Sequence, residues 1–257
     1  MSDSPPNSIP AATVIVFRND PEGGPPQILM VTRDRAMTFA GGMAVFPGGR
    51  VDPEDYALAD ATTHGLDRDE AAHRIAAVRE TLEETGLVIG IHEAVSAGAA
   101  GAARERLLAD GHLAGTLEAM GWTLDLSAVV PFARWHPRNE RLPRIFDTRF
   151  YLADLGTGAV DLEIDGSENT HLFWTSAAGA LEAAERGELS VIFPTRRNLE
   201  RLARFASFAE ARAQAEAIPV REITPWVEER DGERWLTIPD DTGYPVCAER
   251  LDRALRQ

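Results

Sequence analysis

Arg79-Glu80-Thr81-Leu82-Glu83-Glu84-Thr85-Gly86-Leu87 is the stretch of this chain from which its fold and its chemistry can be inferred. At about 100° per residue, Glu80, Glu83 and Glu84 fall within an arc of roughly 100° on a helix. The opposite face is apolar and consists of Ala71, Ile75, Val78 and Leu82. The pattern predicts an amphipathic helix over residues 69–85 that buries one face and presents three carboxylates on the other.

Both ends of this helix carry sequence signals. Asp67 or Asp69 can serve as the N-cap, because a short acidic side chain accepts hydrogen bonds from the first backbone N–H groups of a helix. Gly86 is suited to the C-terminal cap, where glycine adopts the left-handed backbone conformation at little steric cost. The helix is therefore expected to end directly after its acidic cluster.

The three carboxylates have two interpretations. Like charges three and four residues apart repel each other by about 0.2–0.5 kcal/mol per pair, and only Arg79, four residues before Glu83, offers local compensation. A bound Mg²⁺ or Mn²⁺ would remove this repulsion, since both ions prefer carboxylate oxygens. The alternative is an ordinary solvated charged face, and the helix alone is compatible with either.

A glycine turn lies upstream of the helix. Phe46-Pro47-Gly48-Gly49 follows an apolar run and is followed by Asp52 and Asp55. Such a turn can bring backbone close to a phosphate, although it also fits a simple strand-ending turn. The chain has neither a GxxxxGK[ST] loop nor a GxGxxG motif after a strand, so the two best-known phosphate-binding motifs are excluded.

These residues resemble the Nudix hydrolases, whose box has the form G-x5-E-x7-R-E-U-x-E-E-x-G-U, with U a bulky aliphatic residue. Residues 79–87 match the second half of the box at every specified position, and Gly49 fits its leading glycine. The chain departs from the box twice. The early acid is Asp55 instead of glutamate, and 23 residues separate it from Arg79 where the box has seven.

The resemblance implies metal-dependent hydrolysis of a phosphoanhydride with Mg²⁺ or Mn²⁺ as cofactor. It implies four metal ligands, namely the carboxylates of Glu80, Glu83 and Glu84 and the carbonyl of Gly48. Arg79 would orient Glu83 through a salt bridge. The general base would be Glu168, which lies six residues before Trp174, with Glu163 or a box glutamate as the alternatives.

One Nudix subgroup is more closely similar, the diphosphatases of coenzyme A and acyl-coenzyme A. In its second signature, Arg33, Gly42 and the segment 46–49 fall at the right spacing, whereas Asp34 and Thr38 depart from the pattern. The resemblance implies substrate-binding roles for Arg33, Gly42, Phe46 and Gly49, and cleavage to 3′,5′-ADP and a phosphopantetheine. Hydrolysis of ADP-ribose, a nucleotide sugar or a dinucleoside polyphosphate is the alternative, and a non-catalytic Nudix-like binding module is the second.

Composition limits the possible partners. The net charge is −15 and 44% of the residues are hydrophobic, without an apolar run long enough to span a membrane. The acidity argues against nucleic-acid and anionic-membrane binding, so a small nucleotide-type substrate is expected. Cys247 is the single cysteine, which fits a reducing compartment, and we expect a cytoplasmic protein. A homodimer is a further possibility.

The order of predicted elements indicates an α/β protein. We expect a Nudix-type α/β/α sandwich with a mixed β-sheet, extended by C-terminal helices and a β-hairpin. The predicted organisation is a flexible tail at 1–10, a hydrolase domain at 11–194 with an insertion near 56–68, and a packed C-terminal extension at 195–257. Strands are expected at 12–17, 27–33, 43–46, 87–91, 128–135, 145–152 and 172–174. Helices are expected at 97–120 with a break at Gly111, at 176–186 and at 195–217, and a hairpin turn at Asp231-Gly232.

Overall fold

A mixed β-sheet forms the centre of the protein. The computed structural model describes residues 8–34, 40–138, 144–155 and 169–254. The strands of this sheet are β1 (Ser8–Arg18), β2 (Gln27–Arg33), β3 (Ala44–Val45), β4 (Gly48–Arg50), β5 (Val130–Trp135), β6 (Ile145–Asp154), β7 (Asn169–Ser176) and β8 (Glu222–Ile223). The main path runs β3-β2-β1-β6-β5-β8, while β4 pairs with β1 and β7 with β2. The predicted mixed sheet is therefore confirmed.

The longest strand pair joins the two halves of the sheet. β1 and β6 run parallel from Ser8↔Ile145 to Phe17↔Asp154, and β5 pairs with β6 in antiparallel register. On the other side of β1, the short strand β4 places Thr13 opposite Gly48. β1 therefore links the glycine turn to the centre of the sheet.

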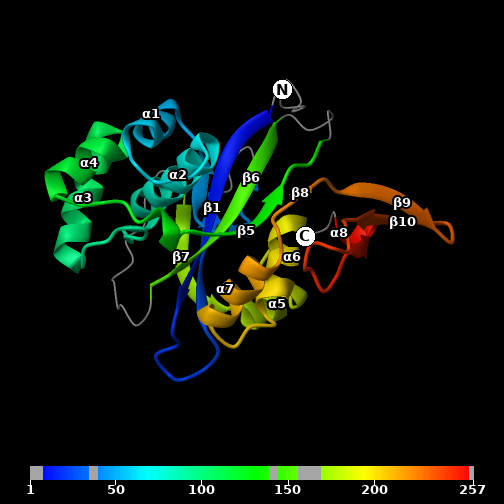
Figure 1. Cartoon of the computed structure of the whole chain (residues 1–257). Coiled ribbons are helices and arrows are strands. Elements are labelled where there is room, and N and C mark those ends of the chain that lie inside the picture. Colours follow the sequence, from blue (N-terminus) through cyan, green and yellow to red (C-terminus); the bar gives the residue numbers. More distant parts are fainter. Residues whose placement is uncertain (1–7, 35–39, 139–143, 156–168, 255–257) are drawn as a thin grey trace.

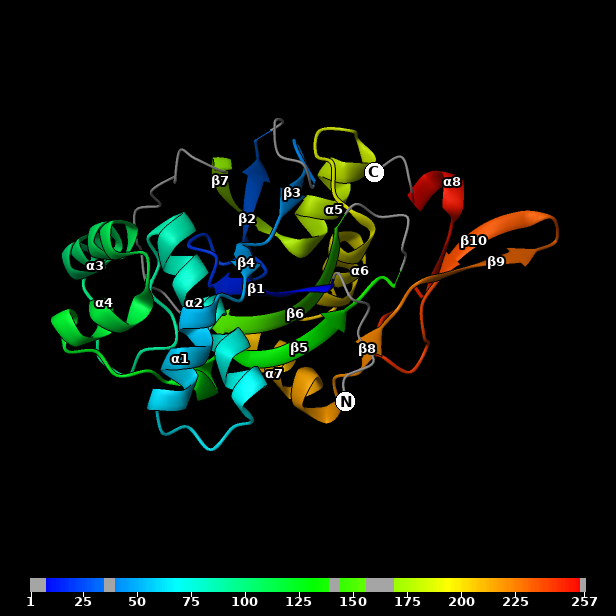
Figure 2. The ribbon, with the colours of Figure 1, turned by 90° about the horizontal axis from the view of Figure 1, so that it is seen from above.

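Helices cover both faces of the sheet, as Figures 1 and 2 show. On one face α2 (Arg68–Thr85) packs against the sheet, and α1 (Pro53–Ala61), α3 (Ala97–Asp110) and α4 (Leu113–Met120) join the same apolar cluster, with α3 packed on α2. The other face packs against α5 (Ala177–Glu185), α6 (Phe193–Leu202) and α7 (Phe208–Ala217). Each face has its own apolar cluster, because alternate strand residues such as Val14 and Ile15 point to opposite sides. This arrangement is the expected α/β/α sandwich.

Several elements differ from the sequence prediction. β1 begins at Ser8, so residues 8–10 belong to the sheet and not to a flexible tail. The expected strand at 87–91 is only an isolated bridge between Ile91 and Leu124. The single helix predicted over 195–217 is wrong: Ser207 starts a new helix, its side chain accepting a hydrogen bond from the Glu210 N–H. The Glu210 carboxylate accepts a hydrogen bond from the Ala206 N–H, and the S-x-x-E pattern of residues 207–210, typical of a helix start, is visible in the sequence.

The C-terminal segment adds a separate small sheet. β9 (Trp226–Arg230), β10 (Glu233–Thr237) and β11 (Ala248–Arg250) pair in the order β11-β10-β9, followed by α8 (Leu251–Ala254). Asp231 and Gly232 both have positive φ angles, of 52° and 78°, so the predicted hairpin turn is confirmed. Figure 2 shows this hairpin projecting from the body of the molecule. Within the described residues, none of the helices combines the length and apolarity that crossing a membrane requires.

Candidate active site

The acidic cluster occupies the last two turns of α2. Asp67 caps the start of the helix by accepting hydrogen bonds from the N–H groups of Asp69 and Glu70. At the other end, Gly86 has φ 73° and donates its N–H to the carbonyl of Leu82. Both predicted ends are confirmed, with Asp67 as the N-cap. The apolar stripe of α2 is at most 2% exposed and packs on the sheet, which fixes the direction in which the carboxylates point.

The glycine turn lies directly against these carboxylates. The Gly48 N–H donates a hydrogen bond of 2.9 Å to Oε2 of Glu84. A Cβ atom on Gly49 would lie only 2.4 Å from the Glu80 carboxylate, so a side chain at this position would displace it. The turn and the acidic helix, predicted separately from the sequence, therefore form one site.

Arg79 is the hub of the ion pairs at this site. It donates two hydrogen bonds of 3.0 Å to the Asp55 carboxylate, and both side chains are buried. Its contacts with Glu80 and Glu83 are 2.8 Å and 3.3 Å. The resemblance implied that Arg79 orients Glu83, but its bidentate partner is Asp55. Although 23 residues separate them in the sequence, α1 places Asp55 in direct contact with Arg79.

Burial and crowding raise the proton affinity of these acids. Burial, together with the neighbouring charge of Glu83, raises the pKa of Glu80 to about 7 against the opposing effect of Arg79. Burial also raises the pKa of Asp55, although Arg79 partly counteracts it. The acids in turn raise the pKa of Arg79 despite its burial, so it stays charged. The site concentrates negative charge that one arginine does not balance.

The donor chemistry fits a divalent cation. Asp52, Asp55, Glu80 and Glu83 all form ion pairs with the single Arg79 guanidinium, at 2.8–3.5 Å. Hard oxygen donors in excess of their cationic partners are the ligands that Mg²⁺ and Mn²⁺ prefer. Among the described residues, no three His, Cys, Asp or Glu side chains already converge on one cation position. The glutamates would therefore have to turn from Arg79 and from the Gly48 N–H to coordinate an ion together.

Comparison with known proteins agrees with this geometry. Residues 8–106 match the sequence model of the NUDIX domain family. This matched stretch, which is less than half of the chain, contains both the glycine turn and the acidic helix and is similar to a Nudix domain. The fold is similar to that of a NUDIX hydrolase from Alicyclobacillus acidocaldarius, with 26% identity, a TM-score of 0.68, and coverage of 82% of this chain and 97% of that one.

Two further solved structures are less similar to this chain in sequence and in fold. A MutT protein from Methanosarcina mazei Go1 is 15% identical, with a TM-score of 0.44 over 79% of this chain and 97% of that chain. The NUDIX domain of NrtR from Shewanella oneidensis, complexed with ADP ribose, is 12% identical, with a TM-score of 0.42 over 77% and 90%. The comparison with curated proteins gave no match.

The remaining predicted residues of the Nudix site are placed as follows. Arg33 and Gly42 face each other across the β2–β3 hairpin: the Gly42 N–H donates to the Arg33 carbonyl at 3.0 Å, and Gly42 has φ 75°. Phe46 is 2% exposed and packs in the core, so its side chain supports the turn. Glu163 and Glu168, the proposed bases, lie outside the described residues.

One residue that contacts α2, called the Nudix helix below, has no role in the prediction from sequence. Arg104, on α3, is 6% exposed and donates a hydrogen bond of 3.0 Å to the backbone carbonyl of Glu83. An arginine within the alanine-rich segment 97–106 is the only signal that the sequence offered. Its contact depends on how α3 packs on α2, which no local pattern encodes.

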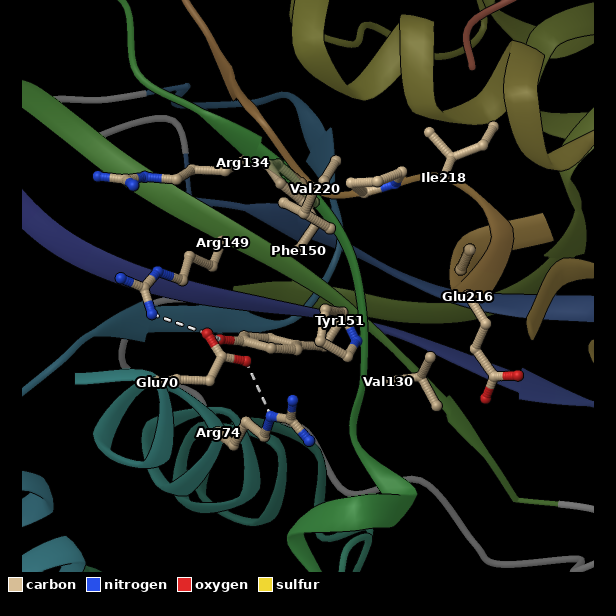
Figure 3. A pocket seen from close by; sticks show the side chains of 14 residues that line it. Glu70, Arg74, Val130, Arg134, Arg149, Phe150, Tyr151, Glu216, Ile218 and Val220 are labelled. Atoms are coloured by element: carbon tan, nitrogen blue, oxygen red, sulfur yellow. Dashed lines mark hydrogen bonds and ion pairs between the residues drawn. The ribbon is translucent and has the colours of Figure 1, made fainter. Parts of the chain in front are cut away.

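A cavity of about 470 Å³ lies away from the Nudix box, at the opposite end of α2 (Figure 3). Glu70 lines it on the side of α2 and accepts hydrogen bonds from Arg74, Arg149 and Tyr151. Its apolar wall includes Val130, Ile218 and Val220. Because Arg149 also pairs with Asp69, the arginines here are already balanced by acids of the protein itself. The cavity therefore lacks the charge excess that marks the Nudix centre.

Proposed function

We propose that this Nudix pyrophosphohydrolase uses Mg²⁺ or Mn²⁺ to cleave the diphosphate of coenzyme A or an acyl-coenzyme A, releasing 3′,5′-ADP and the phosphopantetheine. The observation that carries the proposal is the contact between the acidic helix and the glycine turn, where Gly48 binds Glu84 and Gly49 lies against Glu80. Substrate phosphates can enter such a site only if the turn has no side chains to exclude them.

We assign the following roles in metal binding and catalysis to residues of the chain. Glu80, Glu83 and Glu84, with the Gly48 carbonyl, would hold the cation, which supplies charge neutralisation and acidifies a bound water. Arg79 would hold the carboxylates of Asp55 and Glu83 in place through its contacts with both. Glu168, Glu163 or a box glutamate would accept the proton of the attacking water, so that the phosphoanhydride bond breaks as the new P–O bond forms.

The choice of coenzyme A rests on Arg33, Gly42 and the segment 46–49. The hairpin that joins Arg33 to Gly42 supports this choice, because its backbone hydrogen bonds hold the two signature positions together. ADP-ribose, a nucleotide sugar or a dinucleoside polyphosphate is the alternative substrate class, consistent with the departures at Asp34 and Thr38. A non-catalytic module is the less favoured alternative, since all three box glutamates are present.

Product analysis by mass spectrometry tests the proposal. The protein is incubated with Mg²⁺ and a mixture of coenzyme A, an acyl-coenzyme A, ADP-ribose, NADH and a diadenosine polyphosphate. Glu83→Gln is the test variant, and Glu118→Gln, an exposed glutamate on α4, is the control with the same change in charge. We expect phosphopantetheine from the wild type and from Glu118→Gln but not from Glu83→Gln. Turnover of another diphosphate alone would refute the coenzyme A assignment.

A further inference from the structure

The end of the Nudix helix needs partners from outside the helix. The last four carbonyl groups of any α-helix have no N–H ahead of them within the helix. In α2 the carbonyl of Leu82 is satisfied by the Gly86 N–H, while that of Glu83 accepts a hydrogen bond from Nε of Arg104 at 3.0 Å. A residue of another helix thus completes the turn that carries Glu83 and Glu84.

Arg104 is unusual among the residues of α3. The buried stripe of this helix otherwise consists of Ala100, Ala103 and Leu107, and Arg104 lies among them at 6% exposure. Burying a guanidinium is unfavourable unless hydrogen bonds and opposite charge compensate for the lost water. The C-terminus of α2 supplies a carbonyl acceptor, and the negative end of the helix dipole favours a cation there.

We propose that Arg104 is a positioning residue of the Nudix centre. By holding the Glu83 carbonyl, it keeps the last turn of α2 helical and so fixes Glu83 and Glu84 relative to Glu80. Helix ends otherwise fray, and fraying here would separate carboxylates that must reach one cation together. The inference rests on the proposed function for its catalytic consequence, but the ordering of the helix end is a property of the metal-free protein.

Arg106 provides a matched control on the same helix. It is exposed, and its Nε donates to the backbone carbonyl of Gly115 at 3.3 Å, so it also binds a backbone oxygen of a neighbouring helix. That oxygen belongs to α4, which carries none of the box residues. Arg104→Met and Arg106→Met therefore remove the same chemical group, but only the first touches the Nudix helix.

The experiment combines hydrogen exchange with metal binding. Exchange of the metal-free protein is followed by mass spectrometry for residues 82–87 and, separately, for residues 68–78. Mn²⁺ binding is measured by electron paramagnetic resonance of the free ion. In Arg104→Met we expect faster exchange at 82–87 only, and roughly tenfold weaker Mn²⁺ binding, the loss typical of residues that orient metal ligands. Arg104→Lys should recover part of both effects, and Arg106→Met should match the wild type.

Two results would overturn the proposal. In the first, Arg104→Met binds Mn²⁺ as tightly as Arg106→Met and leaves exchange at 82–87 unchanged. In the second, exchange rises along the whole of α2, including 68–78, which would make Arg104 an ordinary packing residue. A wild type that binds no Mn²⁺ would instead refute the proposed function, while exchange at 82–87 would still decide whether Arg104 orders the helix end.

Discussion

Replacing Gly48 by alanine should be among the most damaging single changes in the molecule. Gly48 has φ 151°, and a Cβ atom there would lie 2.3 Å from the Ala12 carbonyl oxygen and 2.6 Å from Cα of Thr13. Both are backbone atoms of β1, so no rotamer change can relieve the overlap, and β4 would have to move away from β1.

The cost can be worked from three contributions. Alanine at a positive φ costs about 1–2 kcal/mol. Loss of the bond from the Gly48 N–H to the Glu84 carboxylate costs about 1.5–3 kcal/mol. Strain that remains in the displaced backbone adds to both. We therefore expect Gly48→Ala to lower the free energy of unfolding by about 3–5 kcal/mol, a large share of the roughly 5–15 kcal/mol of a typical domain.

Urea unfolding of the metal-free protein, followed by circular dichroism, measures this loss. Gly111→Ala is the control, because Gly111 also has a positive φ, of 75°, but nothing lies within 4 Å of its added Cβ. It should lose only the conformational part, about 1–2 kcal/mol. Equal losses in the two variants would refute the reasoning, since the contact between β4 and β1 would then contribute nothing.

Three further predictions concern stability, pH and metal. Tyr244→Phe should cost about 2–3 kcal/mol in urea unfolding, because the buried Trp135 Nε1–H and Asn198 Oδ1 both lose their bond to the tyrosine hydroxyl; an unchanged midpoint would contradict this. Burial would raise the pKa of Asp147, but the Arg134 guanidinium holds it below the ordinary aspartate value of 3.8. The ion pair between Asp147 and Arg134 therefore stabilises the fold fully above pH 3.8, and this stabilisation is lost as the pH falls through the lower pKa of the folded state. Asp147→Asn should therefore show a smaller decline of Tm in acid than the wild type. Mg²⁺ at 100 times its Kd should stabilise the wild type by about 2.7 kcal/mol, and Glu84→Gln should abolish that gain in a calorimetric scan; a retained gain would place the ion elsewhere.

The acidic helix was accessible to sequence reasoning because its determinants are local. The 3.6-residue period of its apolar stripe, the cap at Asp67 and the glycine at Gly86 act within a few turns of chain. The same local rules could have found the break between α6 and α7, since the sequence contains an S-x-x-E pattern at Ser207 and Glu210 that is typical of a helix start. The prediction of one helix over residues 195–217 followed the continuous apolar periodicity of that segment instead.

The sequence by itself determined the helix, its ends, the box glutamates and the glycine turn, because each depends on neighbours along the chain. Only the tertiary structure decided which partners the buried charges take. Asp55 reaches Arg79 because α1 folds back across the long gap, and Arg104 reaches Glu83 because α3 packs on α2. A buried guanidinium needs hydrogen-bond acceptors, and these come from whichever residues pack around it in the fold. Such residues can lie far apart in the sequence, so no local pattern identifies them.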